Sequence, residues 1–322
     1  MKKKTDNQGP TPSPQAENDQ PQNSCNLAAI DVGSNAARLL IKRVETEPDG
    51  QRHVSKLMFL RVPLRLGMDV FGNGEISEER TKEFVAMMKA YRQLMKVYHV
   101  SQYRACATSA MREARNGADV LRRIADKAHI QLDIITGDEE SRIIYDNHLS
   151  WTLANLPDKQ ASCFLYVDVG GGSTEITFIQ DGERVYSHSF NVGTIRMLKG
   201  KVKPEEIETM KAEVVRLAHG HASVDIIGSG GNINKLYRLA SKKRKMDYLP
   251  VVTLREQLAA LSPLTVEERM ETYSLKPDRA DVIVPAAQIF TLIADCAKAK
   301  RIIVPNMGLA DGMINEMIIG LK

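Results

Sequence analysis

Two short glycine motifs constrain the fold of this 322-residue chain more than any other feature. The first is AIDVGSNAARLLI at residues 29–41, and the second is VDVGGGSTEI at residues 167–176. Each motif has an apolar strand, an aspartate, a glycine turn with hydroxyl or amide side chains, and a second apolar strand. Glycine accepts the positive φ angles that close a tight hairpin, so one motif alone is compatible with an ordinary hairpin. Two copies with their aspartates 137 residues apart (168 minus 31) instead predict two related lobes.

The polar groups of these turns are suited to binding phosphate. Glycines let backbone N–H groups approach a ligand closely, and a run of them can form a concavity that binds anions. Asp168 and Glu175 flank the second turn and are suited to holding a cation, while Ser173 and Thr174 offer hydroxyls to phosphate oxygens. With one turn in each lobe, the sequence predicts two phosphate-binding hairpins that face each other across a cleft.

The rest of the chain alternates between strand and helix patterns, which predicts an α/β protein. Its length is sufficient for two domains that each bury a core, and we expect these at residues 25–146 and 147–322, with the last helix packing back on the first lobe as one arrangement. Apolar residues from Phe84 to Met95 form one stripe of a helix that starts after Ser77. We also expect a polar turn at 72–74, a strand at 130–135, and helices at 118–128, 233–240 and 281–297.

Residues 1–24 contain no large apolar residue after Met1 and are rich in Pro, Gln, Asn and Ser. This composition predicts a disordered tail, and it lacks the apolar region of a signal peptide. No later stretch approaches 18 uninterrupted apolar residues, so the sequence predicts no membrane-spanning helix.

Composition narrows the partners of the chain. The net charge of +4 is mild and there is one Trp, so neither a concentrated basic face nor a stacking platform for nucleic acid is predicted. The four cysteines are scattered without CxxC spacing, which is typical of reduced thiols in a cytoplasmic protein rather than of a disulfide framework or a zinc site. We therefore expect a cytoplasmic protein with an anionic small ligand and no nucleic-acid or membrane partner, and a homodimer is left open.

Three further segments place polar groups after strands. The strand at 103–107 ends in hydroxyls and Arg112, at the sheet edge where open α/β proteins bind ligands. Glu140 lies in TGDEESR (136–142), where it either meets the dipole of a helix in its first turn or reaches a cleft as a catalytic carboxylate. The third segment is a weak signal for an anion or a nucleoside sugar at a helix N-terminus. It comprises Gly228, Ser229, Gly230 and Gly231.

These segments together resemble the exopolyphosphatase / guanosine pentaphosphate phosphohydrolase (Ppx/GppA) phosphatase family, within the superfamily of actin-like, sugar-kinase and heat-shock-chaperone ATPases. GDEESR distinguishes the family from the kinases and chaperones, and the matching runs cover nearly all of residues 25–322 in family order. They are AIDVGSNAARLLI (29–41), ATSAMREARN (107–116), ITGDEESR (135–142), VDVGGGSTEI (167–176), NVGTIRM (191–197), GSGGNINKL (228–236) and DRADVIVPAAQI (278–289).

The resemblance implies two ribonuclease-H-like lobes around a central phosphate-binding cleft. Glu140 aligns with the carboxylate that activates the attacking water. Mg²⁺, or Mn²⁺ in its place, is implied near the reacting phosphoryl group, and hard carboxylate oxygens suit either ion. The residues implied around the metal are Asp31, Asp168 and Glu175. Those implied to hold phosphate oxygens are Ser34, Asn35, Arg112, Gly170, Gly171, Gly172, Ser173 and Thr174.

Three functions are compatible with this resemblance. We favour release of the terminal phosphate from inorganic polyphosphate. The alternatives are removal of the 5′-terminal phosphate of guanosine pentaphosphate and a non-catalytic alarmone or nucleotide sensor. The family commonly has an Arg-Glu-Gly turn where this chain has Ala310-Asp311-Gly312.

The chain also stops at Lys322, without the helical C-terminal domains of longer family members, so we expect a preference for short polyphosphate and dissociation between cleavages. A longer chain of phosphates would need more positive charge along its path. The candidates are Lys199, Lys201 and Lys203 in one loop and Lys242, Lys243, Arg244 and Lys245 in another.

Overall fold

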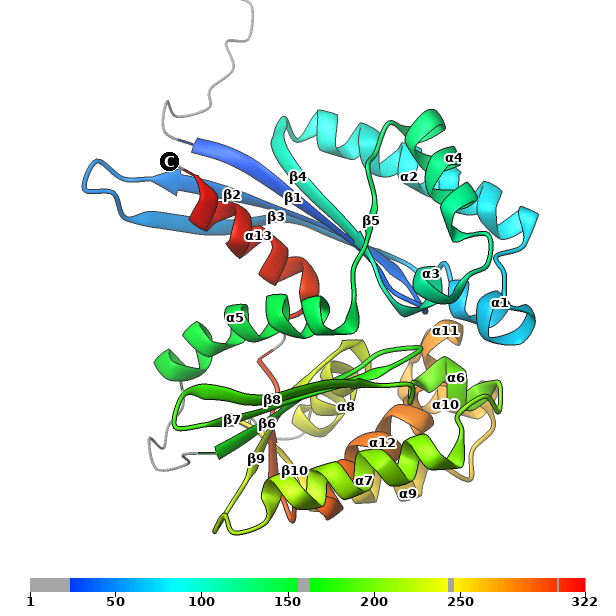
Figure 1. The fold of residues 1–322 in the computed structure, drawn as a ribbon, viewed down its shortest axis with the longest axis vertical. Coiled ribbons are helices and arrows are strands. Elements are labelled where there is room, and N and C mark those ends of the chain that lie inside the picture. Colours follow the sequence, from blue (N-terminus) through cyan, green and yellow to red (C-terminus); the bar gives the residue numbers. More distant parts are fainter. Residues whose placement is uncertain (1–23, 156–162, 243–245, 306, 322) are drawn as a thin grey trace, which may run out of the picture.

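The computed structural model describes residues 24–155, 163–242, 246–305 and 307–321. These residues form two α/β lobes, which Figure 1 shows one above the other, each built on its own sheet. The predicted two-lobe α/β architecture is therefore confirmed. The predicted tail lies outside the described residues except for Ser24, which is the first residue of the first strand.

The first lobe contains a five-stranded sheet of order β3-β2-β1-β4-β5. Strand β1 pairs antiparallel with β2 and parallel with β4, β2 pairs antiparallel with β3, and β4 pairs parallel with β5. The strands are β1 (Ser24–Val32), β2 (Ala37–Thr46), β3 (Arg52–Val62), β4 (Val100–Ala107) and β5 (Asp133–Ile134).

The second lobe repeats this arrangement in a six-stranded sheet of order β10-β11-β9-β6-β7-β8. Without the outer strand β10, the order β8-β7-β6-β9-β11 matches β3-β2-β1-β4-β5, with the same parallel and antiparallel pairs. The two glycine hairpins, β1–β2 and β6–β7, hold equivalent places. The strands are β6 (Cys163–Val169), β7 (Thr174–Gln180), β8 (Glu183–Phe190), β9 (Asp225–Ser229), β10 (Leu249–Pro250) and β11 (Arg301–Ile303).

Helices cover the sheets of both lobes. In the first lobe, α2 begins after Ser77, whose hydroxyl accepts a hydrogen bond from the Arg80 amide at 3.3 Å, and the stripe from Phe84 to Met95 is buried, as predicted. The helices before the second sheet are α1 (Leu66–Asn73), α2 (Glu78–Val97), α3 (Ser109–Glu113), α4 (Gly117–Ala128) and α5 (Gly137–Asn155). The helices that follow β8 in the chain are α6 (Thr194–Leu198), α7 (Pro204–Ala218), α8 (Gly231–Ser241), α9 (Val251–Leu261), α10 (Val266–Tyr273), α11 (Pro277–Ala280), α12 (Ile283–Cys296) and α13 (Leu309–Gly320).

A third apolar core joins the two lobes. Helices α5 and α13 lie between the sheets (Figure 1) and bury Ile143, Ile144, Met313 and Ile314 in a cluster with residues of β1 and β6. The last helix thereby contacts β1 and β2 of the first lobe as well as α5. Gly312 permits the close approach of α5 and α13, since a Cβ there would lie 2.5 Å from the Ile143 carbonyl oxygen. None of the helices in the described ranges is long and apolar enough to span a bilayer.

Candidate active site

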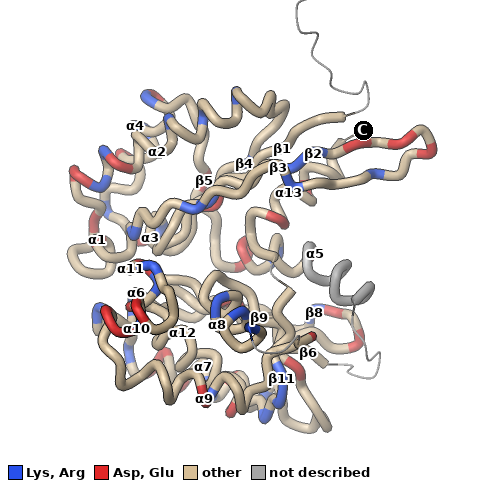
Figure 2. Tube along the Cα trace, turned by 180° about the vertical axis from the view of Figure 1, so that it is seen from behind, with Lys and Arg blue, Asp and Glu red and all other residues tan. Residues whose placement is uncertain are grey.

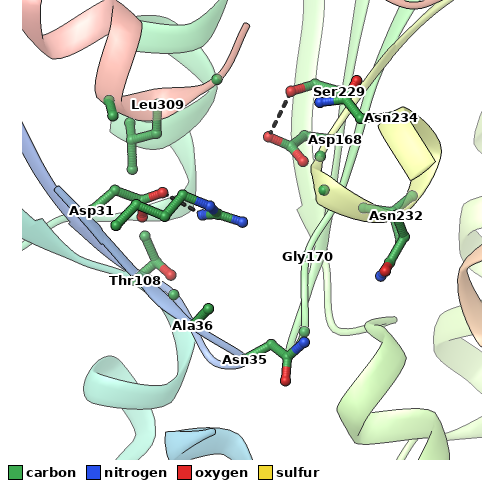
Figure 3. A pocket seen from close by; sticks show the side chains of 18 of the residues that line it. Asp31, Asn35, Ala36, Thr108, Asp168, Gly170, Ser229, Asn232, Asn234 and Leu309 are labelled. Carbon is green, nitrogen blue, oxygen red and sulfur yellow. Dashed lines mark hydrogen bonds and ion pairs between the residues drawn. The ribbon is translucent and has the colours of Figure 1, made fainter. Parts of the chain in front are cut away.

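A cleft of about 420 Å³ opens between the two glycine hairpins (Figure 3). The β1–β2 turn and α3 of the first lobe line one side of it. The β6–β7 turn and the loop between β9 and α8 line the other, and the start of α13 lies on the side of Asp31. A cleft of this size is suitable for a small anionic ligand. Its walls come from segments far apart in sequence, which the duplicated fold brings together.

Four carboxylates meet at this cleft, each placed by the end of a secondary-structure element. Asp31 and Asp168 lie at the ends of the equivalent strands β1 and β6, Glu175 lies at the start of β7, and Glu140 lies in the first turn of α5. Burial, followed by the charges of Glu175 and Asp168, raises the pKa of Glu140. Burial and then the charge of Glu175 raise the pKa of Asp168 to about 7. Ionisation of Glu140 and Asp168 is therefore disfavoured beside Glu175, and a cation would relieve this.

Glu140 forms an ion pair with Arg112 but leaves a buried oxygen without a hydrogen bond. Its Oε2 has no hydrogen-bond partner and lies 3.6 Å from Nη1 of Arg112, which donates to the Ile135 carbonyl at 2.7 Å. The neighbouring Glu139 instead accepts a hydrogen bond from Arg104 at 2.9 Å and does not line the cleft. Of the acidic run in TGDEESR, the structure thus brings only Glu140 to the cleft. Arg112 lies behind Glu140 and is not among the residues that line the cleft.

The three predicted metal ligands already have partners within the protein. Asp31 pairs with Arg38 on the facing strand. Asp168 accepts a hydrogen bond from Ser229 at 3.2 Å (Figure 3). Glu175 accepts hydrogen bonds from Ser173 at 2.6 Å and from Ser189 at 2.8 Å. Within the described ranges, no three acidic, cysteine or histidine side chains are close enough together to bind one ion.

The predicted phosphate ligands divide into two groups. Asn35, Gly170, Gly171 and Ser173 line the cleft. Ser34, Gly172 and Thr174 do not line it. The Ser34 hydroxyl pairs with that of Ser109 at 2.8 Å, and Thr174, which is fully buried, donates to the Val192 carbonyl at 2.5 Å. These two hydroxyls hold the loops in place and are not presented to a ligand.

The second glycine turn also forms the contact between the lobes. A Cβ on Gly171 would lie 2.8 Å from the Ser34 Cβ, and a Cβ on Gly172 would lie 2.5 Å from both Phe71 and Ser109. Arg196 ties the same turn to the first lobe, because its Nε donates to the Gly172 carbonyl at 2.7 Å while its Nη1 donates to Glu113 at 3.0 Å. Gly172 is therefore needed for packing across the interface.

We expect Gly172→Ala to destabilise the folded protein by about 1–3 kcal/mol, the usual cost of overpacking a rigid interior site. Gly320→Ala is the matched control, because no atom lies within 4 Å of a Cβ built there. Denaturant unfolding of both variants measures the difference. Equal free energies of unfolding for Gly172→Ala and the parent protein would contradict this, because they would show that the interface accommodates the added methyl group without loss of stability.

The GSGGN loop contributes to the cleft mainly through its backbone. Ser229, Gly230 and Gly231 line it, whereas Gly228 is packed against Ile302, 2.8 Å from a Cβ built on that glycine. Ser229 is 1% exposed, and its hydroxyl is directed to Asp168. The predicted contact of this hydroxyl with a nucleoside or phosphate thus competes with its role in orienting Asp168.

Sequence analysis did not identify the cations of the cleft. Five basic residues line it: Arg38, Lys56, Arg61, Arg238 and Arg279. Burial, followed by the charges of Arg61 and Arg38, lowers the pKa of Arg279 to about 10. Arg38 and Arg279 lie inside the family motifs AIDVGSNAARLLI and DRADVIVPAAQI. Their place in these motifs could have identified them as candidate site residues.

The departure at Ala310-Asp311-Gly312 has a local structural role. Ala310 and Asp311 line the cleft at the start of α13. Asp311 pairs with Lys42 of β2 at 2.7 Å and accepts a hydrogen bond from the Gly308 amide at 3.2 Å. The aspartate thus caps α13 and ties it to the first lobe.

Comparison with known proteins agrees with this geometry. The chain is 30% identical over 183 residues to a bifunctional 3-dehydroquinate synthase/phosphatase of Fusobacterium nucleatum, a match over 56% of this chain that spans only 27% of that protein. It is 24% identical over 307 residues to exopolyphosphatase 1 of Mycobacterium tuberculosis, covering 89% of this chain and 87% of that protein. An exopolyphosphatase crystal structure from Cytophaga hutchinsonii has the same fold, with a TM-score of 0.78 at 21% identity over 92% of this chain and 99% of that chain.

A family model also matches most of the chain. Residues 47–319 match the model of the Ppx/GppA phosphatase family, which takes in most of both lobes. This match establishes that the chain belongs to the Ppx/GppA phosphatase family, whose members hydrolyse phosphoanhydride bonds.

Proposed function

We propose that the protein is an exopolyphosphatase that hydrolyses the terminal phosphoanhydride of inorganic polyphosphate, with a preference for short chains. The observation that supports this most is the position of Glu140 in a cleft that five basic residues of the described ranges also line, with no hydrogen bond to its Oε2. A carboxylate at such a cleft can accept a proton from water, while cations and backbone N–H groups stabilise the charge on the phosphoryl oxygens.

In this proposal Glu140 is the general base. Its burial, followed by the charges of Glu175 and Asp168, raises its pKa, which makes the ionised carboxylate a stronger proton acceptor. Arg112 holds Glu140 from behind, with its guanidinium fixed by the Ile135 carbonyl. Phosphoryl transfer needs little covalent help from a protein, so positioning of water and phosphate accounts for most of the catalysis.

We further propose that Mg²⁺, with Mn²⁺ as a substitute, binds beside these carboxylates. The fit rests on the chemistry of the donor set: Asp168 and Glu140 are acids with raised pKa values close to Glu175. Mg²⁺ usually keeps several waters and is bound by one or two carboxylates together with substrate phosphates, so a cluster of three protein ligands is not required. Asp168 and Glu175 are the candidate ligands, since Asp31 is already paired with Arg38. When bound, the ion would neutralise charge on the phosphate.

Guanosine pentaphosphate is the second candidate substrate, and one observation favours it. Phe59 of β3 is 52% exposed although it lines the cleft, and the amide side chains of Asn232 and Asn234 line the same cleft. An exposed aromatic ring and amides in one cleft are suited to stacking and hydrogen bonding with a nucleobase. Polyphosphate has no group that would use this ring.

A phosphate-release assay with purified protein and Mg²⁺ separates the candidates. We expect phosphate from tripolyphosphate and from long polyphosphate, with a higher kcat/KM for the short chain, and slower release from guanosine pentaphosphate. A higher kcat/KM for guanosine pentaphosphate than for either polyphosphate would transfer the proposal to the second substrate. Absence of release from all three would refute both.

A further inference from the structure

A group of cations without acidic partners lies where the cleft meets the surface. Lys56 of β3 and Arg238 of α8 both line the cleft and are exposed. Lys235 lies one turn before Arg238 on α8, and Lys242 is the residue that caps the C-terminus of this helix. These four residues are named here the outer basic surface. Within the described ranges, none of the four forms an ion pair with a carboxylate. The other arginines nearby differ, since Arg61 is paired with Asp278 and Arg65 with Asp281.

The spacing of the three residues on α8 makes them one stripe. They lie three and four positions apart, which puts their side chains on the same face of a helix. At a rise of 1.5 Å per residue the stripe extends over roughly 10 Å. Helix α8 begins at the cleft with Gly231, so the stripe runs from the cleft outward, and Figure 2 shows blue residues over this helix.

The charges of the stripe repel each other. Burial, followed by the charges of Lys242, Arg238 and Arg279, lowers the pKa of Lys235. Arg279 itself is not free to meet a ligand at the surface, because its guanidinium donates to the Gly231 carbonyl and to Asn232. An extended run of unpaired like charges is favourable only when an anion binds along it.

We propose that the outer basic surface binds the distal phosphates of a linear polyphosphate whose terminal phosphate lies in the cleft. This inference rests on the proposed exopolyphosphatase function. A linear chain bears negative charge at each phosphate, so it matches a stripe of separated cations, whereas a compact anion would need the cleft alone. The chain leaves the cleft between β3 and α8. Lys199, Lys201 and Lys203 lie between α6 and α7 rather than along α8, so they are not on this path. Of the second predicted group, Lys243, Arg244 and Lys245 lie outside the described residues.

Binding to a Glu140→Gln background tests the path while leaving the polyphosphate intact. Calorimetry would measure the Kd for pyrophosphate and for long polyphosphate. The test variant adds Lys235→Gln and Lys242→Gln, which lie outside the cleft lining. The matched control adds Lys201→Gln and Lys203→Gln, which removes the same charge. Thermal melts of each variant check that the fold is kept.

We expect the α8 variant to bind long polyphosphate roughly 2- to 30-fold more weakly, from two solvent-screened charge interactions. Its Kd for pyrophosphate should stay unchanged, and its affinity for the long chain should depend less on salt. The control should bind both ligands as the background does.

Other results would overturn the inference in distinguishable ways. If the α8 variant binds long polyphosphate as tightly as the background, or if only the control loses affinity, the path is wrong and the proposed function stands. If the background binds neither long polyphosphate nor pyrophosphate, the proposed function and the inference both fail.

Discussion

Glu140→Gln is expected to lower kcat for phosphate release by about 10²–10⁴-fold, the usual contribution of a general base. Glutamine has nearly the same shape but cannot accept the proton from water. The Oε2 of Glu140 accepts no hydrogen bond, and Arg112 beside it is also held by the Ile135 carbonyl, so the substitution should leave the local structure in place. Steady-state kinetics with short polyphosphate measures the effect, and KM should change far less than kcat.

Glu139→Gln is the matched control for this experiment. Glu139 is the preceding residue of the same helical turn, but it pairs with Arg104 and does not line the cleft. We expect kcat within a few-fold of the parent protein, since a partly exposed ion pair contributes about 0–1 kcal/mol. Equal kcat values for Glu140→Gln and Glu139→Gln would remove the base from the mechanism.

Chelation of divalent ions should have the second large effect. We expect EDTA to lower kcat by at least roughly 10²-fold, since a bound ion supplies several kcal/mol of charge stabilisation in reactions of this kind. Mg²⁺ or Mn²⁺ should restore activity after dialysis. Full activity in excess EDTA would count decisively against a metal ion at the cleft.

Stability provides an independent readout of the same ion. Asp168 has a pKa of about 7 in the folded protein against 3.8 ordinarily, so between these values the metal-free folded state binds more protons than the unfolded state. Its contribution to stability is therefore fully present below pH 4 and is lost as the pH rises toward 7. Mg²⁺ should raise Tm more at pH 8, where the carboxylates are ionised, than at pH 5. Equal shifts at both pH values would place the ion elsewhere.

Much of the fold could be predicted because the same pattern occurs twice. The glycine motifs and alternating elements predicted two related lobes, and the sheets have the same strand order. Short elements were less predictable. Residues 72–74 are the end and cap of α1, whose Val70 and Phe71 face the core, and the strand expected at 130–135 pairs only over Asp133–Ile134. The glycines at 72 and 74 and the exposed side chains of β5 are atypical of a helix and a strand. Tertiary packing therefore determines where these two elements form.

The carboxylates of the site could be predicted, because an acidic residue after a strand suggests a specific chemistry. Glu140, Asp31, Asp168 and Glu175 do meet at one cleft. Sequence could not show that Gly172 packs against Phe71 of the other lobe, because that contact joins residues about a hundred positions apart. Nor could it show that the Thr174 hydroxyl is used by a backbone carbonyl. Hydroxyls and glycines serve equally well in packing and in phosphate binding, so only their surroundings distinguish the two roles.

The path of oxygen from water tests the central claim most directly. Tripolyphosphate is hydrolysed in water enriched in ¹⁸O, and the products are separated and weighed by mass spectrometry. If Glu140 activates a water that attacks the terminal phosphorus, one ¹⁸O appears in the released phosphate and none in the shortened chain. Label found in the shortened chain would show attack at the neighbouring phosphorus, and would contradict the placement of the terminal phosphate beside Glu140.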